Sequence, residues 1–113
     1  MVKKETFNLE SNLKLEKHTE GETLTIDLTG RLDTATAPEL EGKLNGWLEG
    51  VSTLILDFKE IEYLSSAGLR VLLFAHKQMM GRGGQLHIKN VQEMVMEVFE
   101  MTGFFDVLSI EGA

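Results

Sequence analysis

The chain has no cysteine and no long apolar run. Without cysteine there can be no disulfide framework, thiolate metal site or cysteine nucleophile, and a reducing compartment fits better than secretion. The longest purely apolar run, residues 71–75, is far shorter than the 18 or more residues of a membrane span. The N-terminus is charged and lacks the apolar stretch of a signal peptide. We therefore expect a cytoplasmic protein with no membrane span.

Clusters of basic residues are also missing. The 18 acidic residues outnumber the 11 basic ones, and the formal net charge is −7. No group of Lys and Arg is interleaved with aromatics, so the composition disfavours direct nucleic-acid binding. A length of 113 residues is that of one domain. We expect a single domain over residues 1–113, with its core at about residues 13–110.

The hydrophobic pattern predicts alternating strands and helices. Residues 13–17 and 24–28 alternate apolar and polar as half-buried strands do, and the turn at 20–22 joins them as a hairpin. Residues 54–58 are apolar at nearly every position, which predicts a central strand covered on both faces. Strands are further expected at 85–89 and 107–110, and helices at 34–50, 66–80 and 91–101.

This order of elements predicts an α/β fold. Pro38 fits the first turn of the first helix, and Gly103 fits the end of the last one. Right-handed crossovers would place the last strands parallel and next to one another. We expect a mixed four- to five-stranded sheet packed with three or more helices.

Residues 57–69 depart from what packing alone requires. Ser65 and Ser66 lie where a strand hands over to a helix. Either hydroxyl could simply cap the helix by accepting a hydrogen bond from a free amide of the first turn. The same positive helix end would also tolerate a phosphoserine, whose added charge would oppose the binding of a partner. Gly68 would allow another backbone to approach the first turn.

Three segments together carry a resemblance to a known family. Residues 57–69, residues 28–33 with Thr36 and Ala37, and residues 100–105 resemble, in this order, the signature of STAS domains. The resemblance spans about residues 23–110 and is specifically to the bacterial anti-sigma factor antagonists. It implies a STAS-like fold and a partner switch that regulates transcription, without enzyme activity.

In the switch that the resemblance implies, the unphosphorylated antagonist binds an anti-sigma factor that is itself a serine kinase, and the sigma factor is released. Phosphorylation reverses this, and a PP2C-like phosphatase removes the phosphate. Ser66 is the implied acceptor, with Ser65 as the alternative, and Asp33 lies in the loop that faces the kinase. The implied partner-binding residues are Asp33, Thr34, Ser65, Ser66, Ala67, Gly68 and Leu69.

Other functions are compatible with parts of the sequence. A STAS module could instead bind a nucleotide or lipid, or serve as a subunit of a transporter or stressosome-like complex. A hydrolase triad from Ser66, Asp57 and either His76 or His87 lacks the G-x-S-x-G elbow and the oxyanion loop of such enzymes. His18 and the other histidines lack metal-site spacing, so we interpret them as structural and expect no catalytic residue, metal or cofactor.

Overall fold

The computed structural model describes residues 2–9 and 12–113. Within them the chain forms strands, helices and one short 3₁₀ turn at Phe104–Asp106. In chain order the elements are β1 (Lys3–Leu9), β2 (Leu13–Glu20), β3 (Thr23–Leu32), α1 (Ala37–Trp47), β4 (Thr53–Leu64), α2 (Ser66–Gly81), β5 (Gln85–Val91), α3 (Glu93–Thr102) and β6 (Ser109–Gly112). No helix in the described part of the chain is long and apolar enough to cross a membrane.

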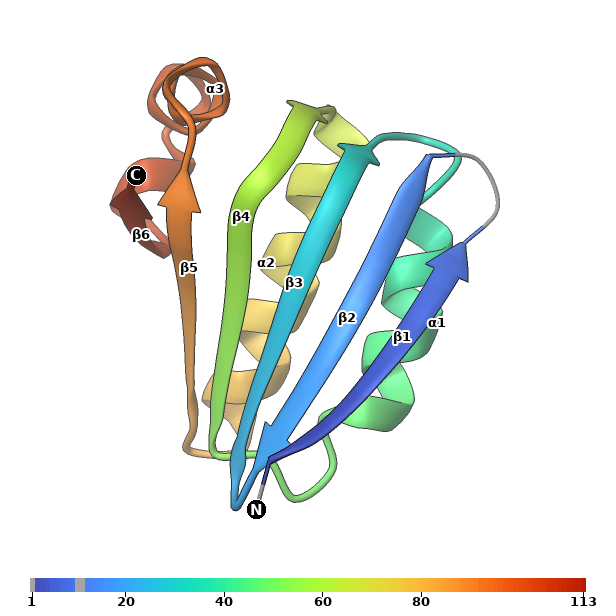
Figure 1. Ribbon diagram of the computed structural model, residues 1–113. Helices are drawn as coiled ribbons and strands as arrows, with labels where there is room; N and C mark the ends of the chain where they lie inside the picture. The colour runs from blue at the N-terminus through green and yellow to red at the C-terminus, as the bar shows by residue number, and fades with distance from the viewer. Residues whose placement is uncertain (1, 10–11) are drawn as a thin grey trace.

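The strands form one mixed sheet in the order β1-β2-β3-β4-β5-β6. β1 pairs with β2 and β2 with β3 in antiparallel fashion, whereas β3, β4, β5 and β6 are parallel to one another. The predicted hairpin and the adjacent parallel strands are therefore confirmed. Helices α1 and α2 cover one face of the sheet, the opposite face is open, and α3 lies beyond the end of β5 (Figure 1).

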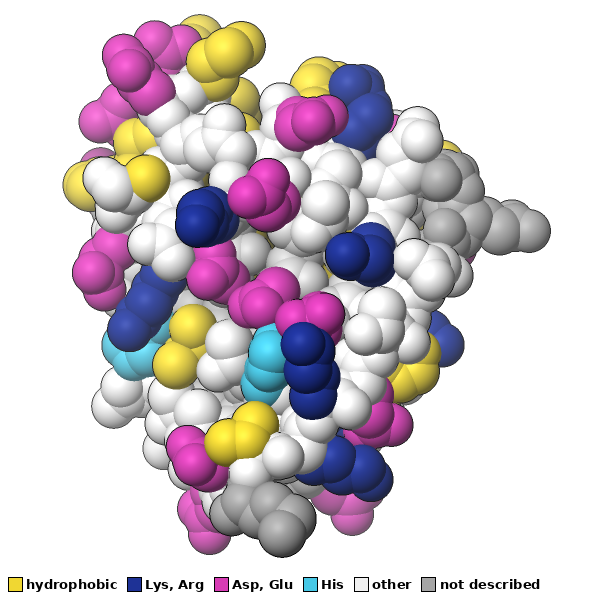
Figure 2. Space-filling view, in the orientation of Figure 1, with side chains coloured by type: hydrophobic (Ala, Val, Ile, Leu, Met, Phe, Trp, Pro, Cys, Tyr) yellow, Lys and Arg dark blue, Asp and Glu magenta, His cyan; other side chains and the backbone are white. Residues whose placement is uncertain are grey.

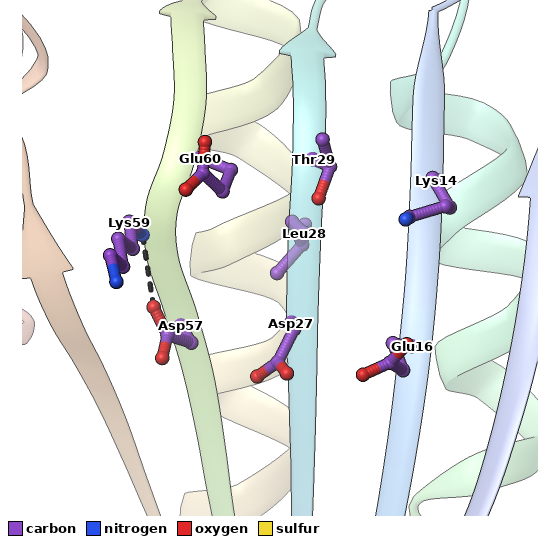
Figure 3. Close-up of a pocket in the computed structure, with 8 residues that line it drawn as sticks. All are labelled: Lys14, Glu16, Asp27, Leu28, Thr29, Asp57, Lys59 and Glu60. Carbon is purple, nitrogen blue, oxygen red and sulfur yellow. Dashed lines mark hydrogen bonds between the residues drawn. The ribbon is translucent and has the colours of Figure 1, made fainter.

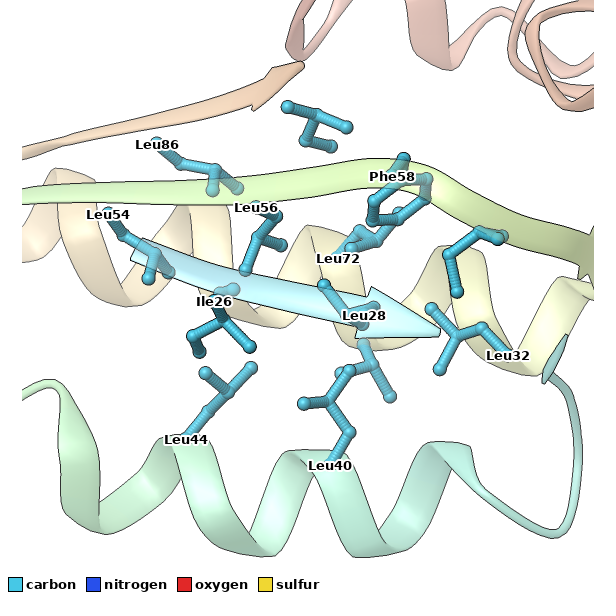
Figure 4. Packing of buried hydrophobic residues seen from close by; sticks show 14 of the residues in the cluster. Ile26, Leu28, Leu32, Leu40, Leu44, Leu54, Leu56, Phe58, Leu72 and Leu86 are labelled. Atoms are coloured by element: carbon cyan, nitrogen blue, oxygen red, sulfur yellow. The ribbon is translucent and has the colours of Figure 1, made fainter. Parts of the chain in front are cut away.

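The core lies between the sheet and its two covering helices. Leu28 of β3, Phe58 of β4 and Leu40 of α1 are almost fully buried there (Figure 4). Each such side chain contributes roughly 1.5–3 kcal/mol by leaving water. Burial alternates along β4, with Leu54 and Leu56 buried but Ile55 only half-buried. β4 is central, as predicted, but the prediction that both of its faces are covered is wrong.

The sheet contains one strand that was not predicted, β1, and one strand that is longer than predicted, β4. β1 was not predicted, because its residues lack a regular alternation, yet it pairs with β2 and makes the sheet six-stranded. Phe7 of β1 contacts Trp47 of α1, with ring centroids 4.9 Å apart. β4 continues through residues 59–64, where shifts in its register against β3 replace strict alternation. Because residues 59–64 do not alternate regularly between apolar and polar, the hydrophobic pattern did not predict this part of the strand.

The three helices lie where the sequence predicts them, although α1 is shorter at both ends and α3 begins two residues later. Pro38 lies in the first turn of α1, and Gly103 ends α3 with a φ of 81°. α1 begins at Ala37 instead of residue 34, because the residues from Asp33 to Thr36 form a hydrogen-bonded turn. This turn follows β3 directly and forms part of the site below.

Candidate functional site

The site begins where two parallel strands end side by side. Leu32 of β3 is in register with Leu64 of β4, so the residues that follow each strand emerge at one edge of the sheet. The backbone N–H of Ser65 donates to the carbonyl oxygen of Leu32 over 3.0 Å. This bond connects the start of α2 to the end of β3. Loops at the carboxyl ends of parallel strands are the common place for function in such sheets.

Ser65 is the N-cap of α2. Its backbone is extended, and its hydroxyl accepts a hydrogen bond from the N–H of Gly68 over 3.3 Å. Its carbonyl oxygen accepts from the N–H of Leu69 over 3.0 Å. The side chain is half-buried. Of the two serines, Ser65 therefore has the capping role that the sequence left open between them.

Ser66 is the first residue of α2 and is exposed. Its hydroxyl makes no hydrogen bond to any residue that the structure describes. The first turn of α2 contains no acidic residue, so the positive end of the helix is not neutralised locally. The exposed Arg70 follows one turn later, at the i+4 position that lies on the same side of a helix.

Gly68 brings α2 close to the sheet. A Cβ atom at this position would lie 2.9 Å from the carbonyl oxygen of Leu32 and 2.7 Å from Cδ1 of Leu64. The sequence predicted that another backbone approaches here, and that backbone is β3 of the same chain. Gly68 and Leu69 are both buried, so they lie beneath the exposed surface that Ser66 belongs to.

Asp33 organises the turn between β3 and α1. Its Oδ1 accepts hydrogen bonds from the backbone N–H groups of Ala35 and Thr36, each over 3.0 Å. The N–H of Thr36 is the main cause of a lowered pKa of Asp33, so the carboxylate stays ionised. Thr34 between them is exposed at the tip of the turn.

Arg31 and Tyr63 border the same edge and were not predicted. Arg31 Nε lies 3.6 Å from Oδ2 of Asp33, and its guanidinium lies over the ring of Tyr63, 4.2 Å from the ring centroid. Tyr63 is 43% exposed, which is high for an aromatic side chain. The pair forms because Arg31 and Tyr63 are partners in the register of β3 and β4. In the sequence Tyr63 follows Glu62, and no local pattern there indicates a contact with Arg31.

The hydrolase triad does not assemble among the described residues. Asp57 accepts hydrogen bonds from the N–H of Lys59 and from Nδ2 of Asn90. The ring nitrogens of His87 lie 3.0 Å from Ser109 Oγ and 3.0 Å from Gln85 Oε1. Asp57 and His87 therefore have other partners, and no hydrogen bond in the described part of the chain joins Ser66 to His76, His87 or Asp57.

Comparison with known proteins gives consistent results. The sequence model of the STAS domain family matches residues 14–112. The protein BtrV of Bordetella bronchiseptica is 36% identical over 84 residues, which cover 74% of this chain and 72% of BtrV. The anti-sigma-B factor antagonist of Bacillus subtilis is 31% identical over 85 residues, which cover 75% of this chain and 78% of that protein.

Solved structures with the same fold include several anti-sigma factor antagonists. One from Mycobacterium paratuberculosis has a TM-score of 0.80 at 16% identity, covering 95% of this chain and 92% of its own. Unphosphorylated SpoIIAA has a TM-score of 0.73 at 23% identity, covering 87% and 86%. The phosphorylated form of SpoIIAA from Bacillus has a TM-score of 0.67 at 22% identity, covering 87% and 89%. At these identities the structures establish a shared fold.

Proposed function

This chain belongs to the STAS domain family, and from that premise we propose that it is an anti-sigma factor antagonist controlled by phosphorylation of Ser66. In its unphosphorylated form it binds an anti-sigma factor that is a serine kinase, and the sigma factor is released. It performs no chemistry itself. Its partners act on transcription, so its proposed place of action is the cytoplasm.

The difference between the two serines carries the proposal. The Ser65 hydroxyl is engaged as the helix cap, whereas the Ser66 hydroxyl is exposed and has no hydrogen-bond partner among the described residues. A kinase can therefore reach Ser66 without opening the helix. The phosphorylated form of SpoIIAA is a precedent within this fold for a chain that keeps its architecture when modified.

A phosphate on Ser66 would be stable on the folded chain. It would carry about −1.5 to −2 charges next to the positive end of α2. Arg70 at i+4 could pair with it on the exposed side of the helix. The fold would stay intact, and the added charge would act on the partner by repulsion and by the cost of desolvation.

The proposed partner surface combines the two loops at this edge of the sheet. Thr34, Ser66 and the half-buried Ala67 are the accessible members of the predicted set. Asp33 and Ser65 hold the two backbones through their hydrogen bonds, and Gly68 and Leu69 support the surface from beneath. A PP2C-like phosphatase that removes the phosphate would have to reach the same surface.

The test is mass spectrometry after incubation with ATP and an anti-sigma factor kinase of the same organism. One added phosphate is expected on the wild type and none on Ser66→Ala. The matched control is Ser65→Asn, which keeps an N-cap acceptor but cannot carry the phosphate. This variant should be phosphorylated like the wild type. Size-exclusion chromatography should show a complex with the kinase that phosphorylation abolishes.

Two results would contradict the proposal in different ways. Phosphate retained on Ser66→Ala and lost on Ser65→Asn would move the acceptor to Ser65. If the protein is not phosphorylated by any kinase of this class and forms no complex with one, the switch is refuted. The alternative of a STAS module that binds a nucleotide or lipid would then be preferred.

A further inference from the structure

The open face of the sheet carries three carboxylates in one row. Glu16 of β2 is in register with Asp27 of β3, and Asp27 is in register with Asp57 of β4. They line a shallow hollow of about 170 Å³ (Figure 3). Like charges directly opposite one another on neighbouring strands destabilise a sheet. A positive charge bound next to these carboxylates would therefore stabilise the sheet.

Asp57 differs from the other two because its partners come from β4 and β5 and not from β2. It accepts hydrogen bonds from the backbone N–H of Lys59 in β4 and from Nδ2 of Asn90 in β5. Glu16 and Asp27 instead face His18, which lies two residues along β2 from Glu16. His18 Nε2 lies 2.9 Å from Asp27 Oδ2 and 3.3 Å from Glu16 Oε1. One imidazole nitrogen and two carboxylate oxygens thus converge from two neighbouring strands.

From this geometry we propose that Glu16, His18 and Asp27 bind a first-row transition dication, with Zn²⁺ as the reference ion. Their ligand atoms all lie within 4.8 Å of one another. In a tetrahedral site with bonds of 2.0–2.2 Å, ligand atoms are about 3.4 Å apart. The 3.3 Å distance from His18 Nε2 to Glu16 Oε1 is close to this value, and the 2.9 Å contact with Asp27 Oδ2 is a hydrogen bond that the ion would replace. Water would complete the coordination on the exposed side.

The donor set determines which ion is preferred. An imidazole nitrogen favours zinc, cobalt, nickel or copper, whereas Mg²⁺ and Ca²⁺ are held by oxygen alone. The competing cation is Lys4, whose Nζ lies 3.4 Å from Glu16 Oε1. Its side chain is 59% exposed, and an exposed ion pair is weak, so a dication could displace it.

The site is separate from the proposed switch. It lies on the open face, where acidic, basic and histidine side chains gather (Figure 2), whereas Ser66 follows the end of β4. Sequence spacing did not reveal it, because Asp27 joins the other two only through the pairing of β2 with β3.

The first experiment is isothermal titration calorimetry, in which Zn²⁺ is added to tag-free protein that has been treated with a chelator and dialysed. One ion should bind per chain. His18→Asn and Asp27→Asn should each weaken binding by about tenfold or more. The matched control is His87→Asn. His87 occupies the same face and the same cross-strand row as His18, but its ring contacts Ser109 and Gln85 instead of carboxylates.

A second measurement needs no variant. In NMR spectra of the wild type, addition of Zn²⁺ should shift the ring resonances of His18 and leave those of His87 unchanged. No saturable binding up to about 1 mM Zn²⁺ would overturn the proposal, since that corresponds to only about 4 kcal/mol. Equal affinity for Mg²⁺, or an equal loss in His87→Asn and His18→Asn, would overturn it as well.

Discussion

Alanine at position 68 tests how closely α2 approaches the sheet. The added Cβ would lie 2.7 Å from Cδ1 of Leu64, 2.9 Å from Cγ of Leu32 and 2.9 Å from the carbonyl oxygen of Leu32. The two leucine side chains can shift. The carbonyl oxygen belongs to the backbone of β3 and already accepts the N–H of Ser65. The start of α2 must therefore move away from the sheet.

Two opposing effects determine the size of the change. Overpacking a filled core costs about 1–3 kcal/mol, whereas alanine is better than glycine inside a helix by up to about 1 kcal/mol. We expect Gly68→Ala to lower the free energy of unfolding by about 1–2 kcal/mol. The matched control is Gly42→Ala in α1, where the added Cβ would meet nothing within 4 Å apart from its chain neighbours and the backbone of its own helix. This variant should be more stable than the wild type by about 0.5–1 kcal/mol.

Urea unfolding followed by circular dichroism measures both variants under the same conditions. A Gly68→Ala protein as stable as Gly42→Ala would refute the close approach of α2 to Leu32. The displaced helix start should also reduce the rate of phosphorylation in Gly68→Ala, because Ser66 moves with it. Gly42→Ala should be phosphorylated at the wild-type rate.

Further predictions concern the caps and the turn of the site. In urea unfolding, Ser65→Ala should lose about 1 kcal/mol of stability with its cap, while Ser66→Ala stays within about 0.5 kcal/mol of the wild type. Thr36 is fully buried, its hydroxyl lies 2.8 Å from the Arg31 carbonyl oxygen, and it accepts the N–H of Asp33. Thr36→Val should therefore cost about 1–3 kcal/mol in the same assay. The lowered pKa of Asp33 stabilises the fold above the ordinary value of 3.8, and this contribution is lost as pH falls through the folded value. The stability advantage of wild type over Asp33→Asn, measured by thermal unfolding between neutral pH and pH 3, should shrink on acidification; an advantage independent of pH would count against this assignment.

Much of the fold could be predicted because its signals are local. The alternation in β2 and β3, Pro38 in the first turn of α1 and Gly103 after α3 each depend on residues within a turn or a strand. β1 escaped prediction because few of its residues are apolar and its stability depends on pairing with β2 and on the contact of Phe7 with Trp47. The open face of β4 also escaped, since Ile55 looks the same in sequence whether or not a helix covers it.

The sequence by itself determined that a helix begins at the paired serines and that the chain has the STAS signature, because capping and motif order are properties of neighbouring residues. Only the tertiary structure decided which serine caps the helix, because the bond from the Ser65 N–H to the Leu32 carbonyl oxygen at the end of β3 fixes where β4 ends and α2 begins. It likewise brought His18 to Asp27, which are nine residues apart. Strand register sets such contacts, and register depends on the packing of the whole sheet against its helices.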